Sequence, residues 1–292
     1  MNVEEGLVLW TKVLTNGRQC SPSQAVLLEL QEYTSLSLDE VKAAAAAAPS
    51  VTRATWDAAD RSTPEGLRAF YQSLTNWVFG TLSYHARQAE GENTPLPVVA
   101  AAALSGRAAG DHLDFGSGVA TASLMFAELG WRISIADVSK PLLDFAAWRF
   151  QTRKIEARVI DLNAKALPAS SYDLITAFNT MAHVPDPAAT FAELRTALRS
   201  GGLLVFDVDS RPRGAGRDDW HLYENDYEII RLVRRTGFRH RPRAWPLYIF
   251  ERAELGWGER AVVTLSDVLR YNGPATWVIE KARRLRARMT RA

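Results

Sequence analysis

Apolar and polar residues follow two different rhythms along the chain, and the change comes near residue 98. From there on, short apolar runs alternate with amphipathic segments of helical period. This alternation is typical of a mainly parallel sheet with helices on both faces, so the sequence predicts an α/β, doubly wound fold. The expected strands are residues 111–116, 131–137, 155–161, 171–178 and 203–209, and the expected helices between them are residues 120–130, 139–153 and 187–200.

The first 94 residues show the start signals and apolar spacing of helices instead. Ser37 and Glu40 have the spacing of a capping box. The alanine run 43–48 continues that helix, and we expect Pro49 to end it because proline lacks the backbone donor. Another helix is expected to begin at Thr63. Its apolar residues at helical spacing are Phe70, Tyr71, Leu74, Trp77 and Val78.

The net charge, the cysteine count and the length of the apolar runs exclude several functional classes. A net charge of +2 is too small to indicate nucleic-acid binding, and we interpret the basic tail 280–292 as a solvated helix, with an interaction patch as the alternative. The single cysteine, Cys20, allows no intramolecular disulfide and favours no thiolate metal site, which fits the cytoplasm. We expect neither a signal peptide nor a membrane span, because no apolar run approaches about 18 residues.

Residues 112–123, HLDFGSGVATAS, read as a strand end, a glycine turn and a helix start, which is typical of a nucleotide site. Gly116 and Gly118 fit a dinucleotide turn, but Thr121 takes the place of the third glycine. Asp114 would repel a pyrophosphate by on the order of 4 kcal/mol at ~4 Å and an effective dielectric of about 20. The turn therefore favours S-adenosylmethionine, which carries cationic groups and no phosphate, over NAD.

Two more acids follow expected strands. Asp137 lies about twenty residues beyond the turn, where a carboxylate accepts hydrogen bonds from ribose hydroxyls. Asp161 follows the next strand and can accept from an adenine amino group. Each acid alone is equally consistent with a loop or cap role, but three acids at successive strand ends favour a shared ligand.

Residues 98–253 resemble the class I S-adenosylmethionine-dependent methyltransferases, most of all the UbiE-like branch that acts on small molecules. The motifs that carry the resemblance are LDFGSG, IADVS, VIDLNAKALP, YDLITAFNTMAHVPDP and LRSGGLLVFDVD. The departures are Ala120 in place of a glycine and Ala182 in place of a frequent glutamate. The resemblance implies a Rossmann-like methyltransferase sheet, with its final hairpin within 238–255. Residues 1–94 are then an N-terminal helical lid that binds substrate, and residues 254–292 a C-terminal helical extension.

The resemblance also assigns candidate site residues. Those for the cofactor are Asp114, Gly116, Ser117, Gly118, Asp137, Val138, Asp161, Leu162, Phe178 and Asn179. Candidate catalytic residues are His183, Tyr71 and Tyr84, and candidate substrate contacts are Trp77, Tyr223 and Asn179. His183 is either a general base or a residue that orients the backbone. No metal is expected.

The leading functional prediction is methyl transfer to a small molecule, for example a natural-product intermediate. The first alternative is a cyclase that converts S-adenosylmethionine to azetidine-2-carboxylate and methylthioadenosine. The second is a cofactor-binding subunit without catalysis. We expect a small-molecule substrate, with no nucleic acid or membrane as partner; a homodimer is possible.

Overall fold

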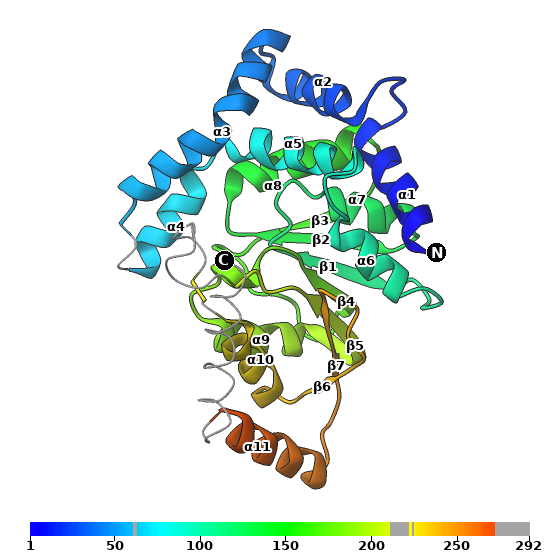
Figure 1. The fold of residues 1–292 in the computed structure, drawn as a ribbon, viewed down its shortest axis with the longest axis vertical. Helices are drawn as coiled ribbons and strands as arrows, with labels where there is room; N and C mark the ends of the chain where they lie inside the picture. The colour runs from blue at the N-terminus through cyan, green and yellow to red at the C-terminus, as the bar shows by residue number, and fades with distance from the viewer. Residues whose placement is uncertain (61–62, 211–221, 224, 272–292) are drawn as a thin grey trace, which may run out of the picture.

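The computed structural model describes residues 1–60, 63–210, 222–223 and 225–271 (Figure 1). Its centre is a seven-stranded sheet in the order β3-β2-β1-β4-β5-β7-β6. Strands β1 to β5 are parallel, and β7 pairs antiparallel with both β5 and β6. The predicted doubly wound sheet and its final hairpin are therefore confirmed. The strands are β1 (Asp111–Phe115), β2 (Arg132–Asp137), β3 (Ala157–Asp161), β4 (Tyr172–Ala177), β5 (Leu198–Phe206), β6 (Phe238–His240) and β7 (Tyr248–Arg252).

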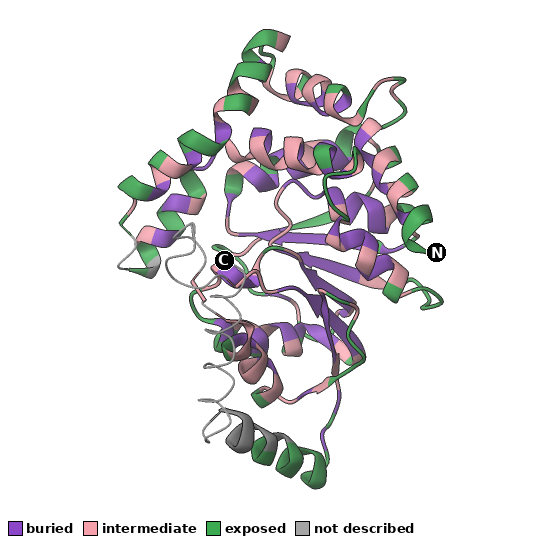
Figure 2. Cartoon of the chain, viewed as in Figure 1, coloured by how far each residue is buried: buried purple, intermediate pink, exposed green. Residues whose placement is uncertain are grey.

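Helices cover both faces of this sheet. One face carries α6, α7 and α8, and the N-terminal helices α1, α2 and α5 pack on these helices in a second layer. The other face carries α9 and α10, and α11 extends beyond them (Figure 1). The strands are mostly buried between the two layers, whereas α11 is mostly exposed (Figure 2). The helices are α1 (Val3–Thr15), α2 (Pro22–Thr34), α3 (Leu38–Ala58), α4 (Pro64–Ser73), α5 (Trp77–Ala89), α6 (Leu96–Ala103), α7 (Thr121–Glu128), α8 (Lys140–Thr152), α9 (Pro187–Ala197), α10 (Asp226–Arg235) and α11 (Trp257–Tyr271).

The expected end of a helix at Pro49 is wrong, because α3 continues through this residue. Proline removes a single backbone donor, so the helix loses the bond to the carbonyl group four residues earlier. Tertiary contacts offset this loss. The Asn76 side chain donates to the Ala48 carbonyl at 3.3 Å and to Thr52 Oγ1 at 2.9 Å. These bonds join the middle of α3 to the start of α5.

The helix expected from Thr63 onward is two helices. Helix α4 ends at Ser73 and α5 begins at Trp77. The break separates two apolar groups. The residues of α4 pack with the end of α3 in a small cluster, whereas α5 packs in the large core shared with the sheet. The small cluster, called here the lid cluster, consists of Trp56, Leu67, Phe70 and Leu74.

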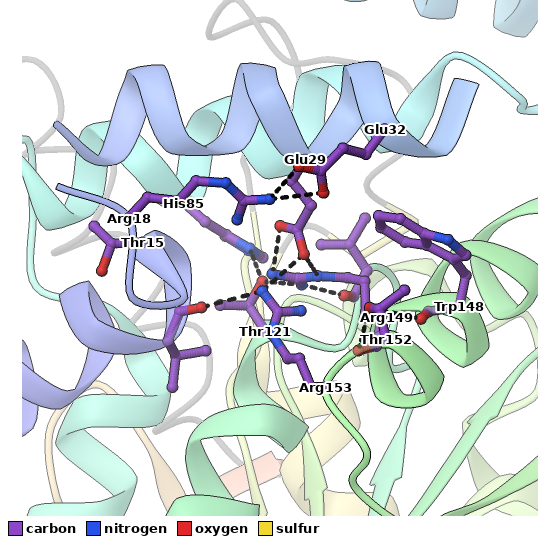
Figure 3. A network of polar contacts seen from close by, with 12 residues as sticks. Thr15, Arg18, Glu29, Glu32, His85, Thr121, Trp148, Arg149, Thr152 and Arg153 are labelled. Carbon is purple, nitrogen blue, oxygen red and sulfur yellow. Dashed lines mark hydrogen bonds and ion pairs between the residues drawn. The ribbon is translucent and has the colours of Figure 1, made fainter. Parts of the chain in front are cut away.

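Helices α1, α2 and α5 are part of the main core, so only α4 and the end of α3 stand apart from it as a lid would (Figure 1). A buried ion pair adds to the apolar contacts: Glu29 of α2 lies between Arg149 and Arg153 of the α8 region, at 3.1 and 2.7 Å (Figure 3). A domain boundary near residue 94 stays a prediction. The C-terminal extension is helical as far as Tyr271, and the basic tail 280–292 lies outside the described residues.

In the described part of the chain, none of the helices combines the length and the apolar character needed to cross a bilayer.

Replacing Glu29 tests the ion pair that joins α2 to α8. Burial alone would raise the pKa of Glu29, but the two guanidinium groups outweigh burial and lower it. In Glu29→Gln, two buried cations lose their counter-charge, so we expect the free energy of unfolding to fall by about 3–5 kcal/mol. Glu128→Gln is the matched control, since Glu128 pairs with Lys12 at the surface and its loss is worth less than about 1 kcal/mol. Urea unfolding of both variants measures the difference, and equal losses would contradict this account.

Candidate functional site

The glycine turn connects β1 to α7 and has positive φ angles at Gly116 (71°), Gly118 (53°) and Ala120 (56°). At Gly116 a β-carbon would lie 2.4 Å from Thr180 Cγ2, so glycine is required where the loop after β4 meets the turn. At Gly118 a β-carbon would meet no described atom within 4 Å. The turn is therefore packed on one side against the β4 loop and open on the side of Gly118.

Asp137 holds the turn from the end of β2. Its Oδ2 accepts from the Gly118 N–H at 2.9 Å and its Oδ1 from the Ser139 N–H at 2.8 Å. Burial raises the pKa of this carboxyl group. Each carboxylate oxygen of Asp137 can accept a second hydrogen bond, so this side chain can also bind the ribose hydroxyls of a nucleoside. The hydroxyl groups of Ser117 and Ser139 are buried and have no hydrogen-bond partner among the described residues, which fits a polar ligand.

Asp161 ends β3 in register with Asp137. Its Oδ1 accepts from the backbone and side-chain nitrogens of Asn163, both at 2.9 Å. The Asn163 side chain also donates to the Val138 carbonyl at 2.8 Å, and the Leu162 N–H donates to the Asp137 carbonyl at 3.1 Å. The structure thus brings these predicted cofactor residues together at one edge. Asn163 is the residue that the sequence analysis missed, although its place after Asp161 marks it as a turn former.

Asp114 lies inside the protein, beneath the turn. Its carboxyl group accepts from Thr176 Oγ1 at 3.0 Å and from Ser123 Oγ at 2.5 Å, and Thr176 Oγ1 also lies 2.8 Å from His112 Nε2. Burial raises the pKa of Asp114 to about 6 and lowers that of His112 to about 3. The hydrogen bonds of the Asp114 side chain are thus made to β4 and α7. Contact of Asp114 with a cofactor stays a prediction.

The loop after β4 approaches the turn from the other side. Asn179 has a positive φ of 52°, and its N–H donates to Asp207 Oδ1 at 2.7 Å. Thr180 donates to the Phe178 carbonyl at 2.9 Å, and Phe178 is partly buried against the main core. The short 3₁₀ helix η1 (Met181–His183) follows, with His183 half-buried at its end. Phe178 and Asn179 therefore lie near the turn, as predicted.

Tyr223 packs on the segment that follows η1. Its hydroxyl donates to the Val184 carbonyl at 2.6 Å, and the Leu222 N–H donates to the Ala182 carbonyl at 2.9 Å. Burial, with the nearby carboxylates of Glu228 and Asp186, raises the pKa of Tyr223 to about 12. The Tyr223 hydroxyl thus supports the His183 segment. The preceding residues 211–221 lie outside the described part of the chain.

The structure separates the two tyrosines proposed for catalysis. Burial, with the charge of Asp137, raises the pKa of Tyr71. Its ring packs on Trp77 with a centroid distance of 5.7 Å. Tyr84 instead exchanges hydrogen bonds with the Asn93 side chain, at 3.3–3.5 Å, and lies 5.7 Å from the Arg87 guanidinium. Tyr71 and Trp77 thus lie together on the lid side, whereas the contacts of Tyr84 lie in the last turns of α5 and the segment that follows.

Among the described residues, no cluster of three or more histidine, cysteine, aspartate or glutamate side chains could hold a metal ion.

Asp207 gives the site a testable pH response. Burial raises its pKa to about 6 from an ordinary value of 3.8, so the folded chain binds this proton more tightly than the unfolded chain. The wild-type free energy of unfolding therefore loses about 1.4 kcal/mol per pH unit from this group between about pH 4 and pH 6. Asp207→Asn removes the titration and keeps an oxygen for the Asn179 N–H. We expect the variant to gain stability relative to wild type between about pH 4.5 and pH 7. Urea unfolding of both proteins across this pH range measures the difference in their free energies of unfolding. A difference that does not change with pH would mean that folding leaves the pKa of Asp207 unshifted.

Comparisons with known proteins add the family. A sequence profile described as a methyltransferase domain matches residues 85–244, more than half of the 292 residues. A ubiquinone biosynthesis O-methyltransferase of Paraburkholderia xenovorans is 30% identical over 102 residues, which are 34% of this chain and 44% of that protein. A ubiquinone biosynthesis O-methyltransferase of Acinetobacter baylyi is 28% identical over 148 residues, 44% of this chain and 62% of that protein. The matched segments span less than two thirds of either relative.

Among solved structures, the chain is similar to phosphoethanolamine N-methyltransferase 2 of Haemonchus contortus, a structure in complex with S-adenosylmethionine. The identity is 18% and the TM-score 0.47, and the match covers 59% of this chain and 44% of that chain. The family match includes the whole glycine turn and the ends of β2, β3 and β4. The chain belongs to the methyltransferase domain family, with the class I sheet described above and S-adenosylmethionine as its cofactor.

Proposed function

We propose that this chain transfers a methyl group from S-adenosylmethionine to a hydroxyl group of a small molecule. The observation that carries the proposal is the pair of carboxylates, Asp137 and Asp161, set in register beside the open face of Gly118. Two acids at this edge disfavour an anionic ligand and favour one with neutral hydroxyls, an amino group and a cationic centre. The family match and the O-methyltransferase names of the two relatives support the same reaction.

The residues at this edge bind the cofactor in this proposal. Asp137 accepts from the ribose hydroxyls and Asp161 from the adenine amino group, while the Ser117 hydroxyl supplies a further polar contact. When bound, the cofactor supplies a methyl carbon for in-line attack by the acceptor oxygen, and the bond from that carbon to sulfur breaks to leave S-adenosylhomocysteine. The acceptor loses its proton, and His183 and Asp207 are the candidate bases on the β4 and β5 side.

The lid side supplies alignment and water exclusion, which are the main protein contributions to a transfer of this kind. The Tyr71 ring packs against Trp77, and the charge of Asp137 contributes to the raised pKa of Tyr71. Aromatic faces attract a sulfonium ion, and they also offer an apolar surface to an aromatic acceptor. We therefore propose that Tyr71, Trp77 and the His183 segment contact the acceptor.

Product analysis tests the proposed function. We expect the chain with S-adenosylmethionine and a panel of phenolic acceptors to yield S-adenosylhomocysteine in an acceptor-dependent way. Methylthioadenosine formed without any acceptor would show the cyclase reaction instead, and tight binding without turnover would indicate a non-catalytic subunit. Asp137→Ala is the control, and its affinity for S-adenosylhomocysteine should fall by about 1.5–3 kcal/mol because charge-assisted hydrogen bonds are lost. An unchanged affinity would assign the ribose to another residue.

The two tyrosines give a matched pair for the lid. Tyr71→Phe removes the hydroxyl proposed to align the acceptor and keeps the ring contacts with Phe70 and Trp77, so we expect turnover to fall by about tenfold while the melting temperature stays the same. Tyr84→Phe removes a hydroxyl that pairs with Asn93, and its turnover should stay close to wild type. Steady-state kinetics with the best acceptor of the panel measures both. Full activity of Tyr71→Phe would remove the hydroxyl of Tyr71 from the reaction.

A further inference from the structure

A fully buried arginine lies directly behind the glycine turn. Arg149 of α8 has no exposed surface, and its Nη1 donates to the Val119 carbonyl at 2.6 Å and to Thr121 Oγ1 at 2.9 Å. Val119 belongs to the turn, and Thr121 is the first residue of α7. A charge-assisted bond to a carbonyl group fixes the direction of that peptide. The guanidinium group therefore holds the turn from the side opposite to its open face.

The other side of the same guanidinium group binds α2. Arg149 Nε and Nη2 donate to the two carboxylate oxygens of Glu29, both at 3.1 Å, in a bidentate pair (Figure 3). Arg153 also binds Glu29, at 2.7 Å, and donates to the Val13 carbonyl at 3.3 Å. The described contacts of Arg153 thus lie with the N-terminal helices, whereas those of Arg149 include the turn. Both arginines bind the Glu29 carboxylate, but among the described contacts Arg149 also binds the glycine turn and Arg153 does not.

A third element joins through the same threonine. His85 of α5 lies 3.0 Å from Thr121 Oγ1 through its Nδ1 and packs edge-on against Trp10 of α1 at 5.2 Å. Burial, with the nearby Arg149, lowers the pKa of His85 to about 3, so the ring is neutral at neutral pH. Thr121 Oγ1 is therefore held by α8 and α5 together. Thr121 thus contacts α5 directly and is linked to α2 through Arg149 (Figure 3). The ring contact of His85 with Trp10 extends this link to α1.

We infer that Arg149 is a positioning residue for cofactor binding and that it couples the cofactor turn to the docking of α2 through Glu29. The inference rests on the proposed cofactor role of the turn. Because a rigid guanidinium fork binds the turn and Glu29 at once, a shift of α2 moves the fork, and a shift of the fork turns the Val119 peptide. Coupling of this kind is reciprocal, so the bound cofactor also stabilises the docked α2.

The test compares Arg149→Met with Arg153→Met by calorimetric binding of S-adenosylhomocysteine. Both variants leave Glu29 with one arginine partner, so both should lower stability. Only Arg149→Met removes the contacts to the glycine turn. We expect Arg149→Met to weaken binding by tenfold or more, and Arg153→Met to stay within about twofold of wild type. Equal affinities of both variants and wild type would overturn the inference, as would equal weakening in both.

Two further measurements keep the test decisive. Where Arg149→Met does not fold, Arg149→Lys takes its place, because a single ammonium group cannot bind the turn and Glu29 in the same way. Lysine should weaken binding by at least fivefold, and wild-type affinity would overturn the inference. Hydrogen exchange adds the reciprocal readout: in wild type, S-adenosylhomocysteine should slow exchange in α2 more than in α10, and no difference would argue against coupling. Absence of binding to wild type would instead contradict the proposed function.

Discussion

A guanidinium group that is fully buried must find acceptors for its donors, and this requirement at Arg149 organises the N-terminal half of the fold. Its acceptors come from α2, from the glycine turn and from the start of α7. None of these groups is near Arg149 in the sequence, so the ion pair forms only when the α/β sheet and the N-terminal helices are packed together. The same contact that stabilises the fold therefore also fixes the shape of the turn.

The turn is held from three directions, and each has its own chemistry. Behind it lies the charged contact of Arg149, beside it the close packing of Thr180 on Gly116, and at the end of β2 the carboxylate of Asp137 that accepts from Gly118. The remaining side is open at Gly118. Rigid backbone around one open face is what a preorganised binding site needs, because less conformational freedom is lost when the ligand binds.

Much of the fold and part of the site could be predicted from the sequence. The strands, the glycine turn and the acids Asp137 and Asp161 have local signals of period, spacing or motif, and the structure places them at one edge. The contacts of Arg149 had no local signal, since Glu29 is 120 residues away. The sequence motif around Asp114 also gave no sign that its carboxyl group is buried and accepts hydrogen bonds from Ser123 and Thr176. Pro49 shows a local rule overridden by packing.

The separate lid cluster makes α4 an independent unit of local stability. Its buried apolar side chains come from the end of α3, from α4 and from the residue after α4, and Trp77 of α5 packs against both this cluster and the main core. Regions with few buried contacts open at a lower free energy than the whole protein. Helix α4 can therefore detach while the sheet, the turn and the ion pair stay intact. Tyr71 would move with α4, so in the proposed function the acceptor enters and the product departs while the sheet stays folded.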